Sequence, residues 1–201
     1  RGTDNATLVF TDSKEETGAF FQSRGVVAWS NTGSPVTWFD PVSTGRTWSS
    51  NWMAFASEEL HTYANLRNGG DPCRLIGYSQ KYVSTQISKG ELPDNRTWRL
   101  PKGREYMQYG FTPDNKVGSW ANGWNFNNGK FLPASGMRSV ADGQLRESGV
   151  GYYWLSDYFT IIDDFGKQYM GRGSKVSSEK VIEEGVVYHS AAGFQIRCVR
   201  Q

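Results

Sequence analysis

GFQIRCVR, residues 193–200, places a strand-like alternation of side chains at the end of the chain. In an extended strand successive side chains point to opposite faces, so Phe194, Ile196 and Cys198 fall on one face, and the other face begins at Gln195. This pattern predicts a strand buried on the side of Phe194, with Cys198 facing inward and positioned to form a crosslink.

A second short segment, Trp98-Arg99-Leu100-Pro101, has the same character. Trp98 and Leu100 alternate with Arg99, which predicts a short strand with one apolar face. The Arg99 guanidinium is then free to pair with a carboxylate or a backbone carbonyl. We expect Arg99 to have a structural role.

Working outward from these segments, the chain shows short strands and long loops. Two segments have helical character, Ser79 to Lys89 and Lys102 to Tyr109. A loop rich in Asn and Gly is expected over 119–129. The predicted strands are 6–10, 18–29 with a bend or bulge, 130–135, 152–156, 166–171, 185–189 and 193–199.

The composition excludes several classes of function. Hydrophobic residues make up 37% of the 201 residues, but 8 Trp, 10 Tyr and 11 Phe predict a core built from bulky aromatic side chains. The 22 basic and 20 acidic residues are scattered, which argues against a nucleic-acid partner. No stretch approaches the roughly 20 apolar residues of a membrane span. Since Arg1 stands where an initiator Met would be, we expect a processed or excised piece of a longer precursor.

The two cysteines, Cys73 and Cys198, lie so far apart that a bond between them would close most of the chain into one loop. In the chain-entropy model such a bond stabilises a fold by roughly 4–5 kcal/mol. The residues alone leave open whether the pair is bonded or consists of two free thiols. A zinc centre is not expected, because the only histidines are His61 and His189 and no CxxC or HxxxH spacing occurs.

Several segments in order resemble the Fibrobacter succinogenes major paralogous domain family, which is found in surface and fimbria-associated proteins of Bacteroidetes. The resemblance covers residues 71–201 and is looser before Asp71. The segments that carry it are Asp71-Pro72-Cys73, Trp98 to Pro101, Glu105, Leu132 to Arg138, Tyr152 to Ser156 including Trp154, and Gly193 to Arg200 including Arg197.

The resemblance implies an α+β, C-type-lectin-like fold with mostly short antiparallel strands, long loops, two short helices and one long-range disulfide, Cys73 to Cys198. It implies a single domain over 1–201, with 71–201 as its family core and 1–70 as its leading strands and loops. Three departures stand out. Lys102 replaces a helix-capping Thr, which weakens the cap that Glu105 would complete. Residues 74–97 form an insertion, and Leu155 replaces a usual Ser.

The resemblance further implies an extracellular module at the cell surface or outer membrane, or on a pilus, that binds a glycan, a surface protein or other pilus subunits. The candidate ligand-binding residues are in the 119–129 loop, and the Gly-rich stretch 142–151 adjoins it. An aromatic plug covering the sheet is the favoured alternative for these rings. The candidate residues are Trp120, Asn122, Trp124, Asn125 and Phe126.

We predict no enzyme, catalytic residue, metal or cofactor. The Glu-Pro-Asn and Trp-Asn-Asp motifs of calcium-dependent lectins do not occur. The adjacent acidic pairs Asp163-Asp164 and Glu183-Glu184 are expected in solvated turns. The catalytic alternative is a formylglycine-generating oxidase, which shares the C-type-lectin-like fold but needs a reactive cysteine pair for copper.

Overall fold

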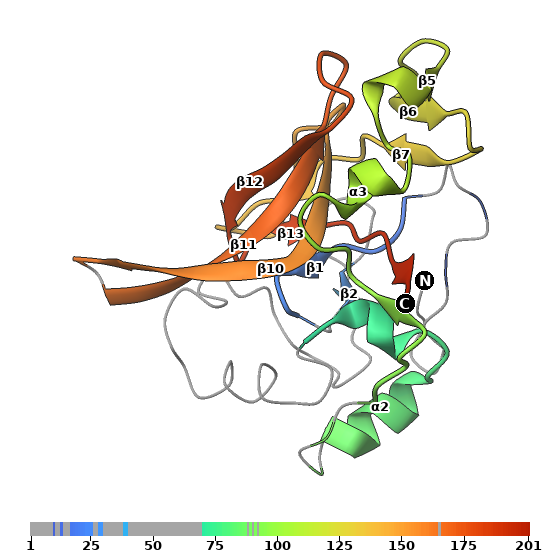
Figure 1. Ribbon diagram of the computed structural model, residues 1–201. Coiled ribbons are helices and arrows are strands. Elements are labelled where there is room, and N and C mark those ends of the chain that lie inside the picture. The colour runs from blue at the N-terminus through green and yellow to red at the C-terminus, as the bar shows by residue number, and fades with distance from the viewer. Residues whose placement is uncertain are drawn as a thin grey trace.

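The computed structural model describes residues 10, 13, 17–25, 28–29, 38–39, 70–87, 89, 91, 93–164 and 166–201. These residues form mostly antiparallel strands in several sheets, with a few short helices and one disulfide (Figure 1). This part of the predicted fold class is confirmed. The predicted strand over 6–10 lies outside the described residues except for Phe10.

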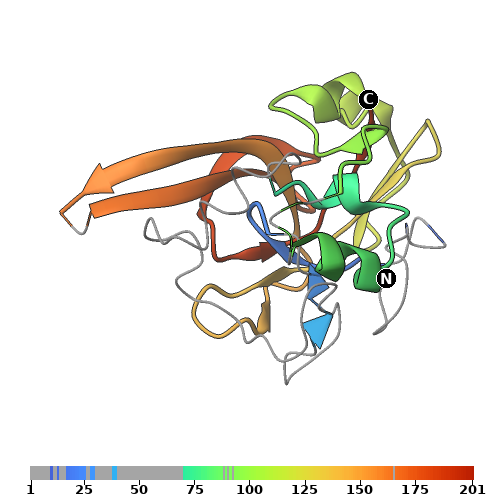
Figure 2. The ribbon, with the colours of Figure 1, turned by 90° about the horizontal axis from the view of Figure 1, so that it is seen from below.

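The longest strands form one antiparallel sheet in the order β10 (Gly151–Asp163), β11 (Gly166–Val176) and β12 (Glu183–His189). Its far end projects from the body of the fold as a two-stranded arm, which Figures 1 and 2 show from two directions. The sequence patterns over 152–156 and 166–171 predict much shorter strands, so that prediction underestimates the hairpin.

A second sheet joins the beginning and the end of the chain. Its order is β1 (Phe21–Gln22), β13 (Gly193–Phe194), β8 (Met137–Arg138) and β9 (Leu145–Arg146). Phe21 of β1 pairs with Phe194 of β13. The first strand of the described chain therefore depends on a residue near the C-terminus.

A third sheet contains β5 (Lys116–Val117), β6 (Gly123–Phe126) and β7 (Phe131–Pro133). The prediction of a loop over 119–129 is therefore wrong for the residues of β6. A Cβ at Gly123 would lie 2.3 Å from the carbonyl oxygen of Leu132, so this close pairing requires glycine. The Gly that looked like a loop residue is what lets the strand form.

The remaining strands form two-stranded sheets, and the helices are short. Ser79 caps α2 (Gln80–Ile87), because its Oγ accepts a hydrogen bond from the N–H of Tyr82 at 3.3 Å. The elements are β2 (Ala28–Trp29) paired with β3 (Trp38–Phe39), β4 (Trp98–Arg99) paired with β14 (Val199–Arg200), the 3-10 helices η1 (Pro72–Leu75) and η2 (Pro113–Asn115), and the helices α2 (Gln80–Ile87) and α3 (Glu105–Gln108).

Strand β10 separates two aromatic clusters of the core. Because side chains alternate along a strand, Tyr152 and Trp154 pack into one cluster, while Tyr153 and Leu155 pack into the other. The first cluster also contains Phe21, Ala192 and Phe194. The second also contains Tyr106, Phe111, Trp124, Phe126, Leu132, Val176 and Val181.

The prediction of one continuous strand over 193–199 is wrong. The segment splits into β13 and β14, which belong to different sheets. Between them Gln195 forms a parallel bridge to Tyr153 of β10, donating its N–H to the carbonyl of Tyr152 and accepting from the N–H of Trp154, both at 3.0 Å. Gln195 is buried beside β10, although simple alternation places it opposite the buried face.

Candidate functional site

A disulfide between Cys73 and Cys198 joins η1 to the segment before β14, which confirms the predicted bond. The S–S distance is 2.06 Å and the Cα atoms are 5.5 Å apart. Strands β4 and β14 pair beside it, with Arg99 opposite Val199. The segments 98–101 and 193–200, which are far apart along the chain, are therefore neighbours in space.

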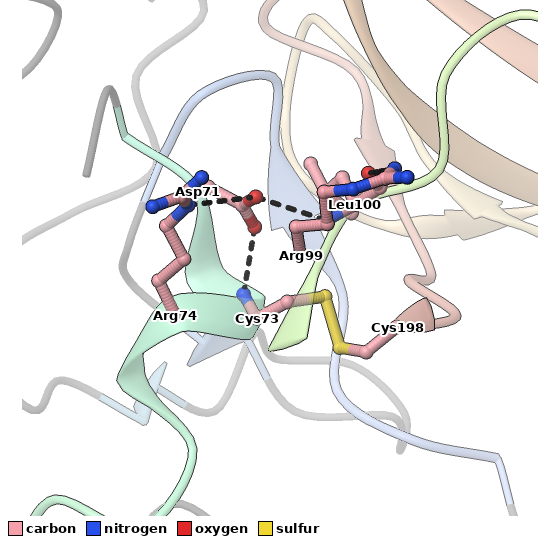
Figure 3. Close-up of a disulfide and its surroundings, with 6 residues drawn as sticks. All are labelled: Asp71, Cys73, Arg74, Arg99, Leu100 and Cys198. Carbon is pink, nitrogen blue, oxygen red and sulfur yellow. Dashed lines mark hydrogen bonds and ion pairs between the residues drawn. A yellow bond between two sulfur atoms is a disulfide. The ribbon is translucent and has the colours of Figure 1, made fainter. Parts of the chain in front are cut away.

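Asp71 ties the disulfide to the neighbouring strand (Figure 3). One of its carboxylate oxygens accepts from the N–H of Cys73 and the other from the N–H of Leu100, both at 2.9 Å, and Arg74 lies 3.7 Å away. Burial raises the pKa of Asp71 above its ordinary value, and the two N–H groups act in the opposite direction. Asp71 is thus a structural carboxylate that holds η1 against β4.

Arg99 makes both kinds of contact that its sequence context favours. Its guanidinium donates to both carboxylate oxygens of Glu105, at 2.6 and 2.7 Å, and to the carbonyl of Leu100 at 3.0 Å. Glu105 also accepts from the N–H of Lys102 at 2.6 Å. This is the contact that the Glu of a capping box makes, and it closes the turn that precedes α3, whose N-cap is Arg104.

Arg138, at the end of β8, lies in the interior and is fully buried. Its Nη1 donates to the carbonyl of Gly143 at 2.5 Å, which holds the turn over 139–143. Burial lowers the pKa of Arg138 to about 10, so it remains a cation at neutral pH. This residue also serves the fold.

Next to the disulfide lies a cleft of about 380 Å³. It is lined by residues of β4, α3, the start of β7 and the last residues of the chain. It therefore lies beside the disulfide-linked elements η1, β4 and β14, which we call the crosslinked base. Its lining residues are Trp98, Tyr106, Tyr109, Phe111, Gly129, Lys130, Phe131, Arg197, Cys198, Val199 and Arg200. We refer to this feature as the terminal cleft.

The terminal cleft carries three cations, and none of its described lining residues is acidic. Lys130 donates from Nζ to the carbonyl of Tyr109 at 2.8 Å and lies 5.2 Å from the ring centroid of Phe111. Arg197 donates from Nη2 to the carbonyl of Phe131 at 3.0 Å. Arg200 is exposed at the end of β14.

Five aromatic side chains, those of Trp98, Tyr106, Tyr109, Phe111 and Phe131, also line the cleft. Tyr106 is buried and packs edge-on against Phe111 and Tyr153, with ring centroids 5.7 and 6.3 Å away. Its hydroxyl has no hydrogen-bond partner among the described residues. Burial raises the pKa of this hydroxyl and outweighs the opposing effect of the Arg197 guanidinium, so Tyr106 stays protonated. The cleft thus combines apolar ring surfaces with positive charge.

The aromatic residues proposed from the 119–129 loop are placed mainly in the core. Trp124 and Phe126 are buried, and the Trp124 Nε1 donates to the carbonyl of Ser177 at 2.8 Å. Trp120 is partly buried and packs edge-on against Trp124 at 5.2 Å. Asn122 is exposed and Asn125 is partly exposed. None of these five residues lines the terminal cleft.

The acidic pairs and His189 lie at separate places in the described part of the chain. Asp164 is exposed in the turn between β10 and β11, and burial raises the pKa of Glu184 on β12. Burial lowers the pKa of His189, whose Nδ1 accepts from the N–H of Ala191 at 3.1 Å. His61 lies outside the described residues. Within the part of the chain that the structure describes, no three His, Cys, Asp or Glu side chains gather in a way that could hold a metal ion.

Sequence patterns indicate structural positions for Trp98 and Arg197, and they do not distinguish Tyr109, Lys130 or Arg200 as site residues. The available signal is weak: a cation at the first position of the predicted strand 130–135 and two more in the terminal segment. Only the pairing of β4 with β14 brings these positions together. None of the helices in the described ranges is long and apolar enough to cross a lipid bilayer.

Comparisons with protein-family models, with curated proteins and with solved structures found no match.

Proposed function

We propose that this chain is a non-catalytic, extracellular binding module with a C-type-lectin-like fold, which belongs to a cell-surface or pilus-associated protein. The observation that carries the proposal is the Cys73 to Cys198 disulfide beside the paired strands β4 and β14. It joins the first and last segments of the family resemblance into one base. A long-range disulfide is typical of proteins that fold in oxidising compartments.

The terminal cleft supports a binding role for this base. Small-ligand sites are concave, largely apolar and furnished with a few polar groups, and they commonly have volumes of about 300–1,000 Å³. The cleft of about 380 Å³ has aromatic walls at Tyr109 and Phe111 and cations at its edge. Because one wall includes Cys198, the disulfide holds the cleft in shape.

The catalytic alternative, a formylglycine-generating oxidase, has less support. Such enzymes bind copper through reactive thiolates. The chain has two cysteines, and both are consumed in the disulfide beside β4. The remaining contacts of the family residues, such as Arg99 with Glu105, hold structural elements together.

Two measurements test the proposal. Intact mass after alkylation of the unreduced protein should show no modified cysteine, and modification of both Cys73 and Cys198 in the native protein would contradict the extracellular assignment. A glycan and surface-protein array should then reveal a ligand whose binding is lost in Tyr109→Ala. The matched control is Tyr78→Ala, which removes a partly exposed tyrosine outside the cleft. Absence of any ligand, or equal binding by both variants, would refute the assignment of function.

A further inference from the structure

We propose that the terminal cleft binds an acidic saccharide, with a sugar carboxylate held by Lys130, Arg197 and Arg200. This inference rests on the proposed binding function and specifies the chemical class of the ligand. It follows from the charge of the cleft, from the state of its backbone donors and from its aromatic walls.

The charge of the cleft selects an anion. Three cationic residues line the same cavity, and no described lining residue is acidic. The nearest acid that the family pattern highlights, Glu105, is already paired with Arg99. Lys130 uses one donor on the carbonyl of Tyr109, and an ammonium has three donors in all. A bound carboxylate would therefore meet charge-assisted donors and little repulsion.

The backbone of the cleft favours a sugar acid over the carboxylate at the end of a peptide. Peptide ends are commonly captured by unoccupied backbone N–H groups arranged as a nest. Here five of the lining N–H groups, on the Trp98, Tyr109, Phe111 and Gly129–Lys130 walls, already donate inside the protein. Occupied donors are those of Trp98 to Asn95 O, Tyr109 to Glu105 O, Phe111 to Tyr106 O, Gly129 to Phe126 O, and Lys130 to Asn128 Oδ1.

The aromatic walls of the cleft would bind the sugar ring, while the cations bind its carboxylate. The flat faces of Trp98 and Tyr109 offer apolar surface to the C–H groups of a sugar ring, as aromatic residues do in small-ligand sites. Both side chains are partly exposed, so their ring surfaces are not wholly consumed by the core. The volume of the cleft suits a mono- or disaccharide, which places ring and carboxylate within reach of wall and cations together.

The test uses digalacturonate as the probe and the galactose disaccharide of the same linkage as its neutral counterpart. Isothermal titration calorimetry on the whole chain should show binding of digalacturonate that is about tenfold tighter than binding of the neutral sugar. Lys130→Gln and Arg200→Gln should each weaken digalacturonate binding about tenfold, since each removes one charge-assisted contact. Raising the salt concentration should weaken it in the wild type.

Lys89→Gln is the matched control, because Lys89 is exposed and does not line the cleft. Its affinity should stay within about twofold of the wild type. Both test residues are exposed, and near-ultraviolet circular dichroism verifies that each variant is folded.

Each contrary result has a distinct meaning. Equal affinity for the neutral sugar, lost in Tyr109→Ala, overturns the acidic-saccharide inference and leaves the binding function standing. Digalacturonate binding that is insensitive to both cation variants overturns the assignment to this cleft. Binding of a short peptide through its terminal carboxylate, with no sugar bound, replaces the saccharide with a protein ligand. Failure of every array ligand and of both sugars removes the proposed function as well.

Discussion

The crosslinked base and the β10–β11 arm are held together in opposite ways. In the base, η1, β4 and β14 come from distant parts of the sequence and are joined by a disulfide, by Asp71 and by strand pairing. In the arm, two consecutive strands pair through local hydrogen bonds. The base depends on long-range contacts, whereas the arm needs only a turn.

Strand β10 runs from the packed core into the exposed arm. Its residues Tyr152 to Leu155 are buried on both faces, while Tyr158, Ile161 and Ile162 are exposed. The pairing register with β11 shifts between Trp154 and Tyr158, which marks an irregularity of the kind that a β-bulge produces. The third strand, β12, pairs with β11 only between Met170 and Lys175, so the outer arm has two strands.

The base and the inner half of β10 should therefore contribute most of the free energy of unfolding. A two-stranded hairpin alone is marginal in water, whereas strands packed on both faces contribute most of the buried apolar surface. Substitutions in the base and in the inner half of β10 should therefore be costly. Substitutions in the arm should have little effect.

The largest effect should follow removal of the disulfide in the Cys73→Ser, Cys198→Ser double variant. Closing a loop of this size stabilises a protein by about 5 kcal/mol in the chain-entropy model. At about 2–4 °C per kcal/mol for a protein of this length, the melting temperature should fall by about 10 °C or more. Thermal unfolding followed by circular dichroism measures it.

Reductant added to the wild type provides the control and should reproduce the loss. An unchanged melting temperature in the double variant would show that long-range crosslinking does not set the stability of the base.

The next effect concerns Trp154 in the inner half of β10. This side chain is 1% exposed, stacks on Phe194 at 4.1 Å and donates from Nε1 to the carbonyl of Phe21 at 2.6 Å. Trp154→Ala leaves a large cavity and should lower the free energy of unfolding by about 4 kcal/mol. Urea denaturation measures this loss.

Trp154→Phe is the informative partner, because it keeps an aromatic ring and removes the indole N–H. It should cost less than the alanine variant and leave the Phe21 carbonyl without this donor. Equal losses in the two variants would mean that the hydrogen bond, and not the packing, dominates at this position.

The sequence predicts the crosslinked base better than it predicts the packing around β10. Alternation in the Trp98 segment correctly indicates β4, and the family resemblance implies the correct disulfide partner for Cys73. Gln195 escapes prediction because its burial arises from hydrogen bonds to Tyr152 and Trp154, which no local pattern contains. The full length of the hairpin is also not predicted from the sequence. Here the local pattern misleads, because Gly171 and Gly173 in β11 look like strand breaks.

These glycines are required by packing against the core. A Cβ at Gly171 would lie 2.6 Å from the Trp154 ring, and one at Gly173 would lie 3.1 Å from the Phe194 ring. The candidate site was missed for a related reason. Lys130 and Arg200 line one cleft only because β4, β14 and β7 come together beside the disulfide, and a side chain's sequence neighbours do not reveal such an arrangement.

A smaller effect should come from the ion pair of the base. Glu105→Gln removes a charge from the two-pronged contact with Arg99 and should lower the free energy of unfolding by about 2 kcal/mol at neutral pH. The Arg99 pair lowers the pKa of Glu105 below its ordinary value of 4.5. Its stabilisation is therefore present above pH 4.5 and is lost as pH falls through the lower folded-state value.

Urea denaturation of wild type and variant at neutral and acidic pH tests this sign. The difference between them should shrink below pH 4.5. Glu91→Gln is the control, because Glu91 is exposed and its substitution should change stability little at either pH. A difference that persists unchanged in acid would contradict an electrostatic origin.

The smallest effect should occur in the arm, at Ile162. This side chain is 81% exposed, so Ile162→Thr removes little buried apolar surface and keeps a β-branched residue suited to a strand. The free energy of unfolding should change by less than about 0.5 kcal/mol, the range of ordinary surface substitutions. Urea denaturation beside Trp154→Ala makes the contrast direct, because both positions lie on β10 and on either side of its register shift. A loss at Ile162 approaching that at Trp154 would mean that the arm is packed against something in solution, and the division of β10 into a core half and an exposed half would have to be abandoned.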